Sequence, residues 1–282
     1  MLAFISSRRA ADFNATPTEW WVGRPRIGTT ESLTVLVLLD ALFAVFVVLQ
    51  ATYLFGGLDT LAASGLTYAE YARRGFFELL AVAFGAAGVI LLFEAFVKQR
   101  SRAYLVAAIG LVGLTLVVLA SAYLRLRLYQ DAYGWTELRF YVLAAILWLA
   151  LGALGTVVAL ATDRTRWLIH GMIALSIVFG LAFNVIGPVR FIAERNVERA
   201  LNPALVPADG ETGLDVYYLA SLGTDADIVL AEALRQMAPP IRQETEAPLR
   251  DNALWMAADI ENQAWQAWNY SRERARTLLG GL

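Results

Sequence analysis

Five long apolar runs dominate the middle of this 282-residue chain. Each runs for about 20 residues, which is the length an α-helix needs to cross roughly 30 Å of hydrocarbon. The chain on either side of these runs is polar. The pattern therefore predicts an all-α, polytopic membrane protein with five spans, at Leu33–Phe55, Phe76–Val97, Ala103–Leu124, Phe140–Ala161 and Trp167–Gly187.

The polar segments divide the chain into three predicted parts. Residues 1–32 read as an N-terminal surface segment, residues 33–187 as the five-helix transmembrane bundle, and residues 188–282 as a small helical extramembrane domain. Pro188 follows Gly187 and is expected to end or kink the last span, because proline lacks the N–H that a helix interior requires.

Within the extramembrane domain, the pattern predicts a helical stalk at 190–201 and a helical hairpin at 215–237. Thr224 or Asp225 is expected to be the N-cap of the hairpin's second helix. Three prolines then predict a linker, and a long helix is expected over Arg250–Leu279. The residues expected to pack this helix on the hairpin are Leu254, Ala258, Trp265 and Trp268.

Composition excludes several kinds of function. The net charge of −2 provides no basic face, so no nucleic-acid partner is expected. The chain contains no cysteine, which rules out disulfides and thiolate metal sites. His170 is the only histidine and has no metal-ligand partner at helical spacing, so we expect no metal and no cofactor.

Basic residues in the short loops predict the orientation. Lys98, Arg100 and Arg102 fill the second loop, and Arg164 and Arg166 lie in the fourth. These loops are therefore expected on the cytoplasmic side. The N-terminus is then expected on the cytoplasmic side and the C-terminal domain on the extracytoplasmic side.

Polar residues inside spans are candidates for function, because burying them in hydrocarbon is costly. Asp40 and Glu78 are the first candidates, as ligands for a proton or a cation. The alternative is a structural carboxylate that a neighbouring helix satisfies. Asn184 continues a stripe with Ser176 and Gly180, at a four-residue spacing that is typical of close helix packing.

A second group of candidates is expected on the outer face of the bundle, where two loops meet. One interpretation is a recognition site for an anionic headgroup or a partner loop, and the other is an ordinary aromatic and arginine belt that closes the bundle. The α-helical spacing of Arg127 and Asp131 predicts an ion pair, Gly134 is expected to end the helix, and Thr136 to cap the next. The group comprises Arg73, Arg74, Arg125, Arg127, Tyr129, Asp131, Glu137 and Arg139.

Several segments resemble a family of bacterial multi-pass membrane proteins known only as a domain of unknown function. They are Gly65–Leu79, Leu128–Tyr141, Asp215–Leu222 and Trp268–Arg272. The resemblance implies a helical, multi-pass protein of a bacterial cytoplasmic (inner) membrane, with an arginine-rich cytoplasmic fourth loop. It implies no activity. Members of the family usually have further spans before the first one here, so this chain resembles a short version or a fragment.

The sequence favours a non-enzymatic scaffold, sensor or complex subunit, with no catalytic residues assigned. Its expected partners are membrane lipids and a protein or second copy, bound through the C-terminal domain or the small-residue helix faces. The alternative is a proton- or ion-coupled transporter, or half-transporter, that uses Asp40 and Glu78. A lipid-modifying membrane enzyme is the third class, and it would need Glu78 to meet Glu137 or Asp131.

Overall fold

The computed structural model describes residues 28–55, 76–97, 101–208, 210–258 and 269–281, with the backbone alone for residues 50–55, 76–78, 80, 91 and 94–96. All the regular elements in these ranges are helices. They are α1 (Thr29–Phe55), α4 (Phe76–Phe96), α5 (Arg102–Tyr133), α6 (Glu137–Ala161), η2 (Thr165–Trp167), α7 (Leu168–Ile186), α8 (Pro188–Leu201), η3 (Pro203–Leu205), α9 (Val216–Ser221), α10 (Thr224–Ala233), η4 (Leu234–Gln236), α11 (Pro239–Ala258) and α12 (Tyr270–Leu279).

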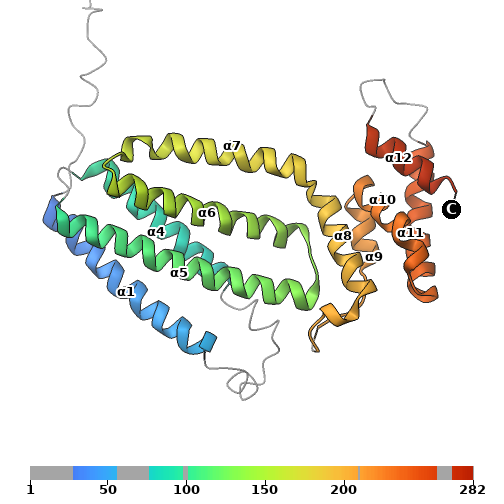
Figure 1. Cartoon of the computed structure of the whole chain (residues 1–282), viewed down its shortest axis with the longest axis horizontal. Helices are drawn as coiled ribbons and strands as arrows, with labels where there is room; N and C mark the ends of the chain where they lie inside the picture. The colour runs from blue at the N-terminus through green and yellow to red at the C-terminus, as the bar shows by residue number, and fades with distance from the viewer. Residues whose placement is uncertain (1–27, 56–75, 98–100, 209, 259–268, 282) are drawn as a thin grey trace, which may run out of the picture.

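The long apolar helices and the shorter polar ones occupy different regions of the molecule. Helices α1, α4, α5, α6 and α7 lie side by side, and α8 to α12 lie beyond one end of them (Figure 1). This is the end at which α5 turns into α6. Helices α8 to α12 therefore lie next to the face of the bundle that the sequence predicts to be the outer one.

Helix α5 lies at the centre of the bundle and packs against α1, α4 and α6. Its fully buried residues include Leu111 and Leu119, which meet Leu36 of α1 and other buried apolar side chains in one hydrophobic core. Large apolar side chains also point outward, for example Leu38 of α1 and Ile177 of α7. Outward apolar faces are stable in hydrocarbon, since lipid and not water surrounds them.

Four helices of the described chain are long and apolar enough to cross a membrane, and they correspond to α1, α5, α6 and α7. The all-α polytopic fold predicted from the sequence is therefore confirmed. Helix α4 is also present where a span was expected, but its described apolar part covers only Ala81–Ile90. The fifth span stays a prediction.

Helices α8 to α12, which the sequence predicts to be extramembrane, share a second hydrophobic core. It contains Ile192 of α8, Leu219 of α9, Leu230 of α10, Leu249 of α11 and Ala275 of α12, which are all almost fully buried. Trp135, in the turn before α6, and Phe140, in the first turn of α6, belong to this second core and not to the core of the bundle. The two parts of the molecule therefore meet through side chains and not only through the peptide link.

Two sequence predictions for the middle of this region, the N-cap of α10 and the linker, are wrong. The N-cap of α10 is Gly223, with a φ of 109°, and not Thr224 or Asp225. The proposed linker is helical: α11 begins at Pro239, where the missing N–H costs nothing, and continues through Pro248. Pro248 is buried, and its neighbour Leu249 belongs to the second core, which stabilises this helix in spite of the interrupted hydrogen bond.

The long helix expected over Arg250–Leu279 is also interrupted. Asn269 has extended backbone angles, and its side chain accepts a hydrogen bond from the N–H of Ser271 at 2.8 Å, so a new helix begins there. Leu254 and Ala258 are exposed, which contradicts the predicted packing on the hairpin. Trp265 and Trp268 lie outside the described residues.

Candidate functional site at the end of the bundle

The turn between α5 and α6 is built by residues close together in the chain. Gly134 ends α5 with a φ of 76° and donates its N–H to the carbonyl of Gln130 at 2.8 Å. Thr136 caps α6 by accepting from the N–H of Arg139, and Arg127 pairs with Asp131 at 3.7 Å. The predicted helix end, cap and ion pair are all confirmed.

The guanidinium of Arg139 lies against the turn itself. Its Nη1 donates to the carbonyls of Tyr133 at 2.9 Å and Gly134 at 2.6 Å. Its Cζ lies 4.0 Å from the centroid of the Tyr129 ring, a distance typical of a cation–π contact. Arg127 likewise lies 5.7 Å from the ring of Trp135. These arginines therefore serve the local structure, which favours the belt interpretation over headgroup recognition.

Asn196 of α8 holds the turn from the other side. Its Oδ1 accepts from the N–H of Trp135, and its Nδ2 donates to the carbonyl of the same residue, both at 2.8 Å. Nδ2 also donates to the carbonyl of Ile192 within α8 at 3.0 Å. One side chain thus satisfies both backbone groups of a buried residue, as a β-strand partner would.

Arg199, one turn further along α8, reaches the end of α5. Its Nη2 lies at 3.0–3.1 Å from the carbonyl oxygens of Asp131, Ala132 and Glu211. The carbonyls at the end of a helix carry partial negative charge, which stabilises a cation there. Burial lowers the pKa of Arg199 from its usual value, although Asp131 acts in the opposite direction.

Tyr218 of α9 completes the contact. Its hydroxyl oxygen accepts a hydrogen bond from the N–H of Glu137, in the first turn of α6, at 2.9 Å. Phe191 of α8 packs edge-on against Trp135, with 5.0 Å between ring centroids. We call these contacts the joint: the turn Tyr133–Glu137 together with Phe191, Asn196, Arg199 and Tyr218.

Sequence reasoning identified the turn but not its partners. Asn196 and Arg199 lie on a helix that reads simply as a polar stalk, and no local pattern links them to residues about 60 positions earlier. Tyr218 does fall within one of the segments that resemble the family, which was the one available signal.

Of the other outer-face candidates, Asp131 and Glu137 take part in these contacts through their backbone, as an acceptor for Arg199 and a donor to Tyr218. Arg125 is buried in the bundle, at 5% exposure, and does not lie on the outer surface. Asp131 is half-buried and Glu137 is exposed. Arg73, Arg74 and the side chain of Glu78 lie outside the described residues, so a pairing of Glu78 with Glu137 or Asp131 stays a prediction.

Asp40 points toward α5. A Cβ placed on Gly110 would lie 3.6 Å from its Oδ2, so the carboxylate occupies the space that this glycine leaves. The other oxygen, Oδ1, is buried and has no hydrogen-bond partner among the described residues. Asp40 therefore lies between helices. A carboxylate there can bind a proton or a cation, or it can be a buried group that lowers the stability of the bundle.

Asn184 lies on the exposed face of α7. Its Nδ2 donates to the carbonyl of Gly180 in the same helix at 2.9 Å. A Cβ on Gly180 would meet no atom within 4 Å, so no described helix packs closely at this point of the stripe. Ser176 is the exception, because its hydroxyl accepts from Trp148 Nε1 of α6 at 3.2 Å.

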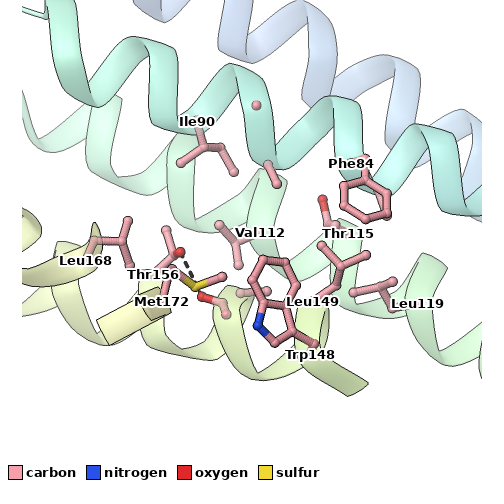
Figure 2. A pocket seen from close by; sticks show the side chains of 15 residues that line it. Phe84, Ile90, Val112, Thr115, Leu119, Trp148, Leu149, Thr156, Leu168 and Met172 are labelled. Atoms are coloured by element: carbon pink, nitrogen blue, oxygen red, sulfur yellow. Dashed lines mark hydrogen bonds between the residues drawn. The ribbon is translucent and has the colours of Figure 1, made fainter. Parts of the chain in front are cut away.

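An apolar cavity of about 270 Å³ lies inside the bundle, between α4, α5, α6 and α7. Figure 2 shows Phe84, Val112, Trp148 and Met172 around it. Its two threonines, Thr115 and Thr156, donate to carbonyls of their own helices at 2.8 and 2.9 Å. The lining thus offers shape and hydrophobic surface without an acid or a base. Over the described residues, no group of three or more histidine, aspartate or glutamate side chains could hold a metal ion.

A comparison with known protein families identifies the family of this chain. A family described as a domain of unknown function, DUF4153, matches residues 2–233. The chain belongs to this family. No curated protein and no solved structure matches it. The match includes the bundle, the joint and α10, whereas α11 and α12 lie beyond it.

Just beyond the joint, this member of the family carries a buried acid that the sequence did not single out. Asp227 of α10 is 1% exposed, and its Oδ1 accepts from Asn252 Nδ2 of α11 at 2.9 Å. Asn252 also donates to the carbonyl of Ala220 at 3.1 Å, so it ties α11 to both α9 and α10. Burial raises the pKa of Asp227 from 3.8 to about 6, although the hydrogen bond from Asn252 acts in the opposite direction.

This raised pKa predicts a pH dependence of stability. Because the pKa is higher in the folded state, the unfolded state releases the proton first, and stability falls as pH rises from about 4 to about 6. Asp227→Asn keeps an acceptor for Asn252 and is expected to stabilise the domain by about 2 kcal/mol at pH 7.5, with little change at pH 4. Hydrogen exchange of α10 and α11 would measure this. Asp251→Asn, at an exposed neighbouring position, is the control, and equal pH profiles for both variants would contradict the prediction.

Proposed function

We propose that this protein is a non-enzymatic subunit of a membrane complex, which presents its C-terminal helices to a protein partner. The observation that carries the proposal is the joint. Asn196, Arg199 and Tyr218 bind the backbone of the α5–α6 turn through hydrogen bonds of 2.8–3.1 Å. A domain fixed in this way presents its surface in a defined orientation, which reduces the entropy lost when a partner binds.

The surface of this domain supports a protein partner. Leu254 and Trp255, near the end of α11, are 70% and 78% exposed, and Tyr270 at the start of α12 is 67% exposed. Trp255 also lines a pocket of about 300 Å³ with Met256, Ala258 and Arg272. Tryptophan, tyrosine and arginine are the residues that most often dominate the energy of protein interfaces. We call Leu254, Trp255 and Tyr270 the apolar patch.

Loop charge supports an extracytoplasmic position for this domain. Arg102, Arg164 and Arg166 lie at the ends of α5, α6 and α7 that are opposite the joint. Basic loops favour the cytoplasmic side of a bacterial inner membrane. The proposal therefore places the partner on the outer side.

If a protein partner binds the apolar patch, a single substitution in the patch should prevent that binding. Trp255→Glu should remove a stoichiometric protein that co-purifies with the full-length chain in mild detergent, because it introduces a charge into a desolvated contact. The matched control is Tyr217→Glu, which changes another aromatic residue of the same domain that is 64% exposed. Loss of the protein in both variants, or in neither, would contradict the proposal.

A transporter is the second candidate, and one observation favours it. Asp40 lies between α1 and α5 with a buried oxygen that has no partner among the described side chains, as an ion or proton ligand would. Proton or cation flux in proteoliposomes that disappears in Asp40→Asn would establish this alternative in place of the first.

A further inference from the structure

A groove of about 490 Å³ runs along the surface of the bundle between α6 and α7. It adjoins the cavity of Figure 2, because Gly152, Leu168 and Met172 line both. On α6 the groove extends from Leu151 to Thr162, which corresponds to roughly 16 Å at the rise of an α-helix. This is about half the ~30 Å thickness of the hydrocarbon core, so the groove has the depth of one leaflet.

Two glycines create the groove. A Cβ on Gly155 of α6 or on Gly171 of α7 would meet no atom within 4 Å, so neither glycine is required for helix contact. Gly152 differs, because a Cβ there would lie 2.9 Å from the sulfur of Met172. A methyl group at Gly152 would therefore have to shift the flexible end of the Met172 side chain, whereas Gly155 and Gly171 leave open space.

Apart from Arg164 and Trp167 at one end, the described lining of the groove offers no unsatisfied polar side chain. Val158 and Leu175 are apolar, and the hydroxyl of Thr162 donates to the carbonyl of Val158 at 2.7 Å. An acyl chain forms no hydrogen bonds, so it can pack against such walls without leaving a polar group unsatisfied.

One end of the groove is basic and aromatic. Arg164 lines it, is exposed, and forms no ion pair with any residue that the structure describes. Trp167, which is 59% exposed, lies beside it in η2. Tryptophan favours the headgroup level of a bilayer, and a basic side chain between transmembrane helices attracts an anionic headgroup.

We propose that this groove binds an anionic glycerophospholipid, with one acyl chain between α6 and α7 and the phosphate on Arg164. The lipid comes from the surrounding bilayer and covers an apolar surface that no described helix covers. The site is independent of the proposed partner surface, which lies on the extramembrane helices.

Native mass spectrometry of the detergent-solubilised full-length chain tests the site, with dioleoyl-phosphatidylglycerol and dioleoyl-phosphatidylcholine as the two probes. The wild type should bind the anionic lipid more tightly. Arg164→Gln should weaken that binding roughly fivefold, the effect of one basic side chain near an anionic surface, and leave the neutral lipid unaffected. Arg235→Gln, which removes an exposed arginine of the extramembrane domain, should change neither.

A second set of variants tests the site by filling the groove with side chains. Gly155→Leu together with Gly171→Leu should abolish binding of both lipids, whereas Gly180→Leu, at an open position on α7 outside the groove, should retain it. Equal binding of the two lipids by the wild type, or unchanged binding after filling, would overturn the proposal. If the double variant does not fold, Arg164→Gln decides alone, and an unchanged preference between the lipids overturns the site.

Discussion

Replacing Asn196 with alanine is expected to release the extramembrane helices from the end of the bundle. The side chain satisfies both the N–H and the carbonyl of Trp135, which is 7% exposed, at 2.8 Å each. Without it, two buried backbone groups lose their partners. Each unsatisfied group costs about 1–3 kcal/mol, so we expect the joint to lose at least about 2 kcal/mol of stability. Hydrogen exchange should become faster in α8, α9 and α10 while the bundle stays protected.

Asn202→Ala is the matched control for this prediction. Asn202 follows α8 and, like Asn196, donates from Nδ2 to a carbonyl four residues earlier, that of Glu198 at 3.0 Å. Its side chain is exposed, and the structure describes no hydrogen bond from it to the turn. We expect a change below about 1 kcal/mol, as is usual at such surface sites. If both variants accelerated exchange equally, the joint would not depend on the contacts to Trp135.

Local interactions explain how much of the site could be predicted from the sequence. The ion pair of Arg127 with Asp131, the helix end at Gly134 and the cap at Thr136 each depend on residues within four positions of one another. Such contacts follow from helix geometry alone, so spacing was sufficient to predict them. Four of the spans could equally be predicted, because their length and apolar composition reflect the thickness of a bilayer.

Tertiary contacts explain the rest. The hydrogen bonds of Asn196 to Trp135 and of Glu137 to Tyr218 join residues 61 and 81 positions apart, and no local rule selects such pairs. Tertiary packing also explains the predictions that the structure does not support. Pro248 reads as a helix breaker in sequence, but burial beside Leu249 in the second core outweighs its local preference. Arg125 reads as part of an outer arginine cluster, yet it lies among the helices.

Gly134→Ala is expected to have the largest effect of any single substitution in the joint. Gly134 has φ 76° and ψ −172°, a region almost restricted to glycine, and side chains there cost about 1–3 kcal/mol in strain. A Cβ would also lie 2.3 Å from Asn196 Oδ1 and 2.7 Å from Arg199 Nη1. The methyl group must displace both side chains, so we expect a total loss of about 4 kcal/mol or more. Chemical denaturation monitored by hydrogen exchange in α8 would measure it.

Gly223→Ala separates the cost of backbone strain from the cost of displacing Asn196 and Arg199. Gly223 has φ 109° and ψ −170°, in the same glycine region, but a Cβ there would meet nothing within 4 Å. Its substitution should therefore cost only the backbone strain of about 1–3 kcal/mol. The excess cost at Gly134 measures the displacement of Asn196 and Arg199, and equal costs at the two glycines would contradict the prediction.

A double-mutant cycle extends the same argument, because it tests whether Gly134 and Asn196 act as one unit. Asn196→Ala removes the oxygen that the new methyl group would strike first, at 2.3 Å. In that background, Gly134→Ala should cost less than in the wild type, and its cost should approach that of Gly223→Ala. Residues in direct contact usually deviate from additivity by about 0.5–3 kcal/mol. Strict additivity would mean that the turn and α8 are independent, and the joint would then not fix the orientation of the extramembrane domain.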